Sequence, residues 1–227
     1  MPRKKFLLTL EGVVIWGLAW LALVGLYHTA AWVGAPVESP FDENGILSAH
    51  SLGEFPFLFW GLTAAGILGV PLLADFLLHK KGLADFGLRR PTGGIKEVAI
   101  AAAFLIALVG YSRLLMALRY ETLPGVSTRE AAALLILPCA LTAFLDEFLY
   151  RGYIQRKWVE AWGPIPGLVI ASVFFALVGH YRAPLIDNLL LRLPAGLALG
   201  ALFLHQRSLI GPILVHTGYN FAIVLSP

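Results

Sequence analysis

Long apolar runs alternate with short stretches of polar residues, glycine and proline along the whole chain. A helix needs about 20 apolar residues to cross the hydrocarbon core of a bilayer. By this measure we predict seven spans, at residues 6–31, 57–78, 97–118, 129–150, 166–183, 189–205 and 209–226. Proline and glycine interrupt the last three, which are also shorter. The pattern predicts an all-α, polytopic membrane helix bundle that forms a single integral-membrane domain over residues 1–227.

Lysine and arginine between these runs predict the orientation of the chain, because cytoplasmic loops carry an excess of both. If the chain alternates across the membrane, twelve of these residues fall on the side of the amino terminus and four on the other. We therefore expect a cytoplasmic amino terminus in a multi-pass protein of a cell membrane, of the bacterial or archaeal inner-membrane type. Residues 6–32 form too long an apolar run for a signal peptide, so we expect them to remain as the first span.

The composition agrees with a membrane protein and excludes several other classes. Hydrophobic residues make up 58% of the chain and charged residues 14%, against roughly 45–50% and about 25% in soluble domains. Soluble, disordered and nucleic-acid-binding proteins are therefore excluded. The formal net charge of +3 is explained by the loop residues that set the orientation. Cys139 is the single cysteine, which excludes an internal disulfide and a cysteine-based metal cluster.

Ionisable residues inside spans cost free energy on insertion and are therefore candidates for function. Glu11 and Asp75 lie near span ends, where we expect structural partners; Lys80 or Lys81 can pair with Asp75. Arg113 is expected either to extend toward the membrane surface or to pair with a buried acid. The histidines at span ends or in loops are not expected to be catalytic: His28, His50, His79 and His205.

Two adjacent acids and an arginine near the end of the fourth span form the first candidate cluster. Glu147 and Arg151 are four residues apart, so in a helix they lie on one face and can form an ion pair. Asp146 points about 100° away from Glu147 and faces another neighbour. In general, desolvation disfavours the charged form of a carboxyl group, which is how proteins produce a general base or acid that works near neutrality.

Two further clusters each contain a histidine. His180 follows an aromatic and glycine-containing stretch, and a turn at Gly163–Pro164 puts it at a depth similar to that of the acids in a helical hairpin. His216 and Asn220 are four residues apart on the last span and share a face. An imidazole and a carboxamide can both donate hydrogen bonds to an oxyanion. Spacing alone is equally compatible with histidines and an acid that satisfy one another in a packed bundle.

In this order, the clusters resemble the signature of the intramembrane endopeptidases that include the CAAX prenyl proteases and bacteriocin-processing enzymes (the CPBP or Abi family). That signature is Glu-Glu-x-x-x-Arg, then Phe-x-x-x-His, then His-x-x-x-Asn or Asp. The basic turn Gly87–Pro91 and the stretch 196–216 are also similar to the family. The resemblance covers about residues 80–221, and the spans within residues 6–78 precede it.

The sequence departs from this signature at two positions. Asp146 stands where the family has its first glutamate, and the aspartate side chain is one methylene shorter. Phe175 and His180 are separated by four residues instead of three. A π-bulge at Gly179 would accommodate the extra residue, and such bulges are frequent at functional sites. The alternative is that this phenylalanine is not the one in the signature.

The resemblance implies an intramembrane endopeptidase that activates water to cleave a membrane-embedded or lipidated peptide or protein. In this interpretation Asp146 is the base, His180 orients the water, and Glu147 either holds Arg151 or replaces Asp146. His216 and Asn220 stabilise the oxyanion. We favour catalysis without a cofactor; if zinc were bound, its ligands would be Asp146, Glu147, His180 and His216.

Two alternatives to an enzyme remain open at this stage. A non-catalytic membrane scaffold or immunity-type protein of the same family is favoured by the aspartate at position 146 and by the shifted histidine. A small proton-coupled transporter would use the same acids as a proton relay. The sequence has no visible inverted repeat, a feature of many transporter folds.

Overall fold

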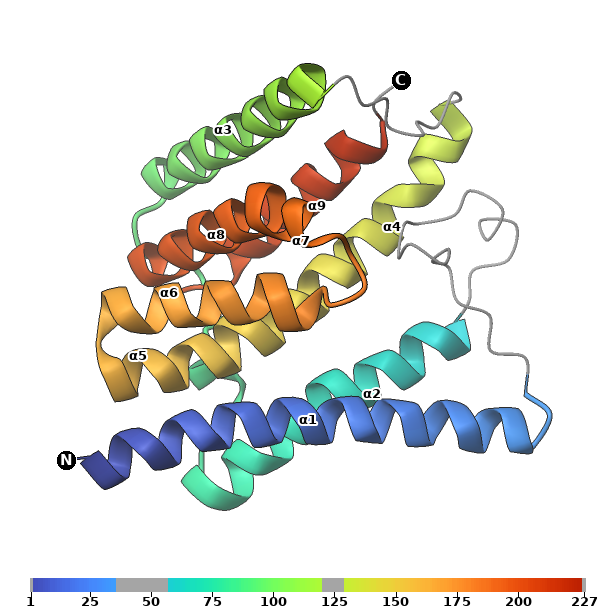
Figure 1. Ribbon diagram of the computed structural model, residues 1–227, viewed down its shortest axis with the longest axis vertical. Helices are drawn as coiled ribbons and strands as arrows, with labels where there is room; N and C mark the ends of the chain where they lie inside the picture. The colour runs from blue at the N-terminus through green and yellow to red at the C-terminus, as the bar shows by residue number, and fades with distance from the viewer. Residues whose placement is uncertain (1, 36–56, 120–128, 226–227) are drawn as a thin grey trace. The chain divides into compact units, whose positions relative to one another are not determined.

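The computed structural model describes residues 2–35, 57–119 and 129–225, and every regular element in them is a helix (Figure 1). Four of the elements, η2, η4, η5 and η6, are π-helical, and η3 is a short 3₁₀ helix. The elements in chain order are α1 (Pro2–Trp32), α2 (Phe57–Ala74), η2 (Asp75–His79), η3 (Leu83–Phe86), α3 (Ile95–Arg119), α4 (Arg129–Asp146), η4 (Glu147–Gln155), α5 (Arg156–Trp162), α6 (Pro164–Phe174), η5 (Phe175–Gly179), α7 (Leu185–Asp187), η6 (Asn188–Arg192), α8 (Leu193–Gln206) and α9 (Ile210–Val224).

Four helical stretches are long and apolar enough to cross a membrane: Arg3–Trp32, Phe57–His79, Ile95–Arg119 and Leu185–Gln206. They coincide with four of the predicted spans. The other three predicted spans, 129–150, 166–183 and 209–226, also overlap helices. Those helices are not among the four stretches that are long and apolar enough to cross a membrane. An all-helical membrane protein is therefore supported, while the number of seven spans and the orientation stay predictions.

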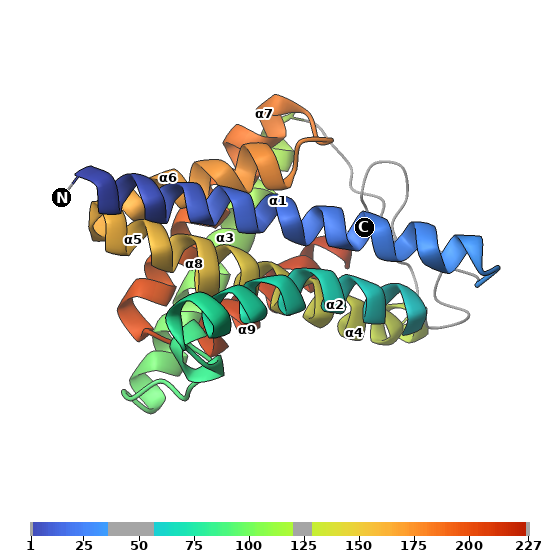
Figure 2. The same ribbon diagram turned by 90° about the horizontal axis from the view of Figure 1, so that it is seen from below.

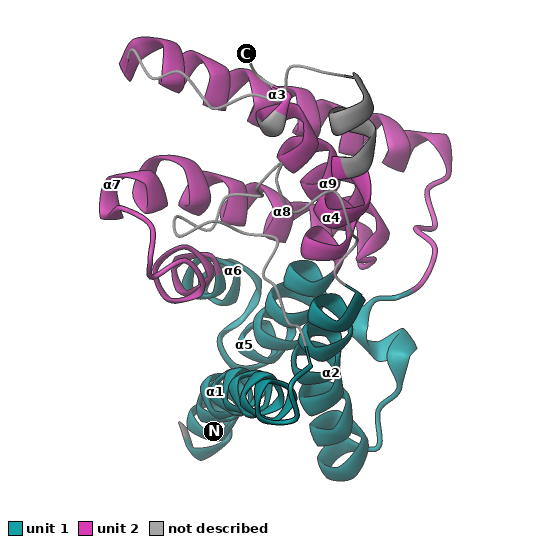
Figure 3. Cartoon of the chain, turned by 90° about the vertical axis from the view of Figure 1, so that its right-hand side faces the viewer, with its two compact units in different colours: residues 1–88, 145–171 teal, residues 89–144, 172–227 magenta. Residues whose placement is uncertain are grey.

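The chain divides into two compact units (Figure 3). Unit 1 contains residues 1–88 and 145–171, and unit 2 contains residues 89–144 and 172–227. Each unit combines segments that are distant in sequence. The prediction of a single domain stays a prediction.

In unit 1, α1 packs against α2 and against α5 (Figure 2). Gly66 allows the close approach of α1 and α2, because a Cβ atom there would lie 3.1 Å from the Leu23 Cβ. Helices α5 and α6 form a tight hairpin around Gly163. The φ angle of Gly163 is 91°, a left-handed conformation that glycine adopts without strain. The predicted turn at this position is therefore present.

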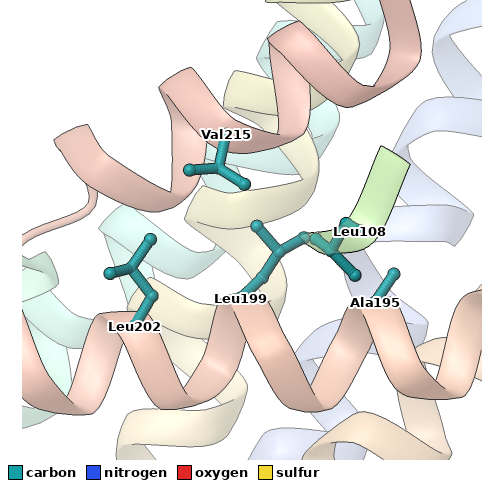
Figure 4. Close-up of a cluster of buried hydrophobic side chains, with 5 residues drawn as sticks. All are labelled: Leu108, Ala195, Leu199, Leu202 and Val215. Carbon is teal, nitrogen blue, oxygen red and sulfur yellow. The ribbon is translucent and has the colours of Figure 1, made fainter. Parts of the chain in front are cut away.

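In unit 2, α3, α8 and α9 pack around a cluster of aliphatic side chains (Figure 4). The cluster consists of Leu108, Ala195, Leu199, Leu202 and Val215. Small residues between the large ones allow the helices to approach, as is usual in membrane bundles. At Gly196, a Cβ atom would lie 3.2 Å from the Phe175 ring, so this glycine serves packing within the unit.

Candidate active site

The first cluster lies at the start of η4, in unit 1. Arg151 Nη1 is 3.1 Å from Glu147 Oε1, so the ion pair expected from their spacing is present. Both side chains are almost fully buried, with exposed fractions of 2% for Arg151 and 0% for Glu147. A buried guanidinium needs a charged partner, because removal of one member leaves the other charge uncompensated. Glu147 thus supplies a negative charge that offsets Arg151.

Asp146, the last residue of α4, differs from its neighbour. Its side chain is only partly buried, whereas Glu147 is fully enclosed. Tyr150, one turn later, is buried and its hydroxyl accepts a hydrogen bond of 3.2 Å from the indole nitrogen of Trp16 on α1. The two acids therefore occupy different environments, as their different directions on a helix predict.

The second cluster lies in η5 of unit 2, where the chain is π-helical from Phe175 to Gly179. The expected π-bulge is therefore present, and it brings Phe175 and His180 into contact with ring centroids 4.7 Å apart. His180 Nδ1 is 3.0 Å from the Phe175 carbonyl oxygen. A carbonyl oxygen only accepts, so Nδ1 carries a proton and donates this hydrogen bond. Asn188 Nδ2 donates to the His180 carbonyl at 3.0 Å and fixes this end of η5.

The third cluster lies on α9, also in unit 2. His216 is buried, and its ring meets the edge of the same Phe175 ring at a centroid distance of 6.4 Å. The two histidines of the second and third clusters are thus grouped around one phenylalanine. Asn220 is one helical turn beyond His216 and is partly buried.

Helix α3 supports α9, a contact that the sequence analysis did not predict. A Cβ atom on Gly218 would lie 2.9 Å from Leu105 Cδ2, so the third motif packs closely against α3. Ser112 Oγ and Tyr219 Oη share a hydrogen bond of 2.9 Å. The exposed Arg113 donates from Nη2 to the Ala222 carbonyl oxygen at 3.1 Å, so it contacts the backbone of α9.

A second group of charges, the ionic network, joins α1, η2 and α5 in unit 1. Lys157 Nζ lies 2.7 Å from Glu11 Oε1 and 2.9 Å from Asp75 Oδ1, and Arg156 pairs with the other oxygen of Asp75. His79 Nε2 lies 2.8 Å from Glu11 Oε1. The expected pairing of Asp75 with Lys80 or Lys81 is therefore wrong. Its partners are instead Arg156 and Lys157, which follow the fourth predicted span.

Side chains of the ionic network also have the composition of a metal site. One oxygen each from Glu11 and Asp75 and one nitrogen of His79 lie within 4.8 Å of one another. However, the Lys157 ammonium lies within hydrogen-bonding distance of both carboxylates. With Arg156 it supplies the positive charge that a cation would bring. These contacts favour an ion-pair network over a metal site.

The predicted site residues thus fall into two groups. Asp146, Glu147 and Arg151 belong to unit 1, and the two histidines and Asn220 belong to unit 2. Within each unit the expected neighbours lie together. The combination of both groups into one catalytic site stays a prediction.

Comparisons with known proteins agree with the motifs. Residues 128–222, less than half of the chain, match a family model described as type II CAAX prenyl endopeptidase, Rce1-like. No curated protein and no solved structure matched the chain. The matched residues contain all three motifs and confirm the resemblance, which points at family level to a membrane-bound protease. Residues 128–222 are therefore an Rce1-like region.

Proposed function

We propose that the protein is an intramembrane endopeptidase that hydrolyses a peptide bond near the membrane surface in a lipidated or membrane-anchored substrate. CAAX-type tails, leader peptides and carboxyl-terminal sorting signals are the substrate classes that fit. The observation that carries this proposal is the contrast between the two acids inside the Rce1-like region. Glu147 is fully buried in an ion pair with Arg151, while Asp146 is partly exposed.

In the proposed reaction, Asp146 takes a proton from a water molecule as the water oxygen attacks the peptide carbonyl carbon. His180 Nε2 accepts a hydrogen bond from the same water and orients it, since Nδ1 is occupied by the Phe175 carbonyl. The protonated Asp146 then gives its proton to the leaving amine as the C–N bond breaks. General acid–base catalysis of this kind contributes about 10²- to 10⁴-fold.

His216 and Asn220 are proposed to donate hydrogen bonds to the oxyanion of the tetrahedral intermediate. Both lie on one face of α9, whose position is fixed by its close packing with α3 at Gly218. Donors that are already in place stabilise developing charge without a cost of reorganisation. Loss of one such donor typically lowers kcat by about 10²- to 10³-fold.

The proposed reaction needs no metal ion, and Glu147, one of the possible ligands, already neutralises Arg151. A zinc ion at this carboxylate would compete with the guanidinium 3.1 Å away. Asp146, Glu147, His180 and His216 remain the zinc ligands of the alternative scheme. Incubation with a chelator distinguishes the two: the metal-free scheme predicts full activity, and the zinc scheme predicts loss that added zinc restores.

The experiment that tests the function is cleavage of lipidated peptides by the purified protein in lipid nanodiscs, read by mass spectrometry. Wild type is compared with His180→Asn and with His205→Asn, a matched control at an exposed histidine near Glu97. We expect the first variant to lose about 10²-fold or more in kcat and the control to keep wild-type activity. Equal cleavage by all three proteins would contradict the proposal.

A non-catalytic scaffold is the second candidate, and the aspartate at position 146 favours it. This function predicts that Asp146→Ala keeps the biological activity of the protein, while no peptide is cleaved by the wild type. Asp146→Ala, measured for both biological activity and peptide cleavage, therefore distinguishes the scaffold from the peptidase. If the protein were a proton-coupled transporter, Asp146→Ala would instead abolish pH-dependent flux in liposomes.

A further inference from the structure

Two connections of unit 2, both outside the three motifs, are joined by hydrogen bonds. One connection precedes α3, and the other links α8 to α9. Arg89 Nε donates to the Arg207 carbonyl oxygen at 2.8 Å, and the buried Ser208 donates from Oγ to the Arg89 carbonyl oxygen. Gln206 Nε2 donates to the Glu97 carbonyl oxygen at 3.0 Å. These bonds fix the start of α3 beside the end of α8.

The joined connections carry an excess of exposed positive charge, here called the basic cluster. Its members are all exposed: Arg89, Arg90, Lys96 and Arg207. Residues 89–97 and 205–210 contain a single carboxylate, Glu97, whose Oε2 lies 3.3 Å from His205 Nε2. In the described part of the chain, no carboxylate forms an ion pair with the basic cluster, and the two Nη groups of Arg89 have no hydrogen-bond partner. The cluster can therefore receive an anion from another molecule.

The basic cluster lies at the ends of two apolar helices that are long enough to cross a membrane. The candidate span Ile95–Arg119 begins within the cluster, and the candidate span Leu185–Gln206 ends beside it. The side chains of Ile95 and Val98, in the first turn of α3, have exposed fractions of 79% and 62%. Exposed apolar side chains thus border the basic ones. Such a border is typical of the headgroup region of a bilayer, where basic side chains extend toward water from an apolar surface.

We propose that the basic cluster binds the phosphate of an anionic phospholipid, with Arg89 and Arg207 in contact with its oxygens. A guanidinium forms paired hydrogen bonds with phosphate oxygens, a geometry that lysine lacks. The bond from Arg89 to the Arg207 carbonyl holds the Arg89 side chain next to position 207, so one phosphate can be shared by both residues.

A lipid is favoured over a soluble anion because the apolar surface beside the cluster can receive the acyl chains. Both connections also lie on the side of the amino terminus in the orientation that the sequence predicts. This is the cytoplasmic side, where basic residues next to membrane helices are attracted to anionic headgroups. The inference does not depend on the proposed function.

The test measures thermal unfolding of the purified protein in detergent micelles that contain phosphatidylglycerol or phosphatidylcholine with the same acyl chains. Phosphatidylcholine has a phosphate but no net charge. Wild type should unfold about 2–4 °C higher with phosphatidylglycerol. The double variant with Arg89→Gln and Arg207→Gln should lose this difference. Each protein is measured in both lipids, so a general loss of stability in the variant cancels.

Two further variants sharpen the comparison. The double variant with Arg89→Lys and Arg207→Lys keeps the charge without the paired geometry and should retain part of the difference. Arg182→Gln is the matched control, because Arg182 is an exposed arginine of the same unit that contacts the ring of its neighbour Tyr181. This control should keep the full difference.

The inference is overturned if wild type unfolds at the same temperature in both lipids, or if the double glutamine variant keeps the wild-type difference. It is also overturned if inorganic phosphate without lipid stabilises wild type as much as phosphatidylglycerol does, since the cluster would then bind a soluble anion. Native mass spectrometry provides a second measurement. Wild type should retain more phosphatidylglycerol per molecule than the double glutamine variant, and equal retention would contradict the proposed site.

Discussion

The two units stabilise apolar helices by different means. In unit 1, α1, η2 and α5 are joined by the ionic network, in which Lys157 and Asp75 have exposed fractions of 1% and 0%. In unit 2, α3, α8 and α9 are held by closely packed aliphatic side chains and by hydrogen bonds such as the one between Ser112 and Tyr219. In lipid, apolar surface alone provides little force for helix association, so both close packing and polar contacts are needed.

The difference predicts how each unit responds to substitution. A buried charge that loses its partner remains buried and uncompensated, at a cost of about 3–5 kcal/mol. Loss of an aliphatic contact removes only the packing contribution to the free energy of unfolding, because the neighbouring helices or lipid fill part of the space. Unit 1 should therefore be the more sensitive of the two. It also contains the acids of the first motif, so its charges bear on activity as well as on stability.

The largest effect is expected from Lys157→Met in unit 1. The substitution removes the ammonium that lies 2.7 Å from Glu11 and 2.9 Å from Asp75. We expect a loss of about 3–5 kcal/mol in the free energy of unfolding, measured by denaturant titration in detergent micelles. Lys80→Met, at an exposed lysine, is the control and should have almost no effect. A small loss in Lys157→Met would mean that the network does not stabilise unit 1.

A smaller effect is expected from Gly218→Val in unit 2. The added side chain meets Leu105 on α3 and should destabilise the protein by about 1–3 kcal/mol through overpacking. Gly110→Val is the matched control, because a Cβ atom there has no neighbour within 4 Å. Thermal unfolding of both variants checks this prediction. Equal stabilities would argue against close contact between α3 and α9.

The smallest effect is expected from Glu160→Gln, at the exposed edge of unit 1. Partial burial raises the pKa of the Glu160 carboxyl, but Lys4, 3.1 Å away, together with Lys81 and Lys157 lowers it by more, so the pKa lies below its usual value. The pair therefore stabilises the protein above the unfolded-state pKa, and this contribution is lost as the pH falls through the lower folded-state pKa. An exposed pair of this kind contributes about 0–1 kcal/mol.

Thermal unfolding between neutral and acidic pH tests this expectation. Glu160→Gln should be slightly less stable than wild type near neutrality, and the two should converge in acid. A difference that grows as the pH falls would show that the sign is wrong.

Much of the local structure could be predicted from the sequence. Apolar runs predict the long helices, the spacing of Glu147 and Arg151 predicts their ion pair, and the extra residue before His180 predicts the π-helical turn. All of these depend on residues close together in the chain. Periodicity and spacing are sufficient for such contacts.

The ionic network could not be predicted in the same way. Its partners are distant in sequence, as Glu11 and Lys157 illustrate, and basic residues after an apolar run normally indicate a cytoplasmic loop. Phe86, just before the basic turn Gly87–Pro91, is likewise buried and stacks on Phe148 with centroids 4.6 Å apart. Such contacts follow from tertiary packing.

The central claim is that the two adjacent acids have separate roles, with Asp146 as the base and Glu147 as the partner of Arg151. Turnover of a lipidated peptide by Asp146→Asn, Asp146→Glu and Glu147→Gln tests it most directly. We predict at least about 10²-fold loss of kcat in Asp146→Asn with unchanged stability, retained turnover in Asp146→Glu, and reduced stability in Glu147→Gln. Full activity in Asp146→Asn, together with loss of turnover in a stably folded Glu147→Gln, would contradict the claim.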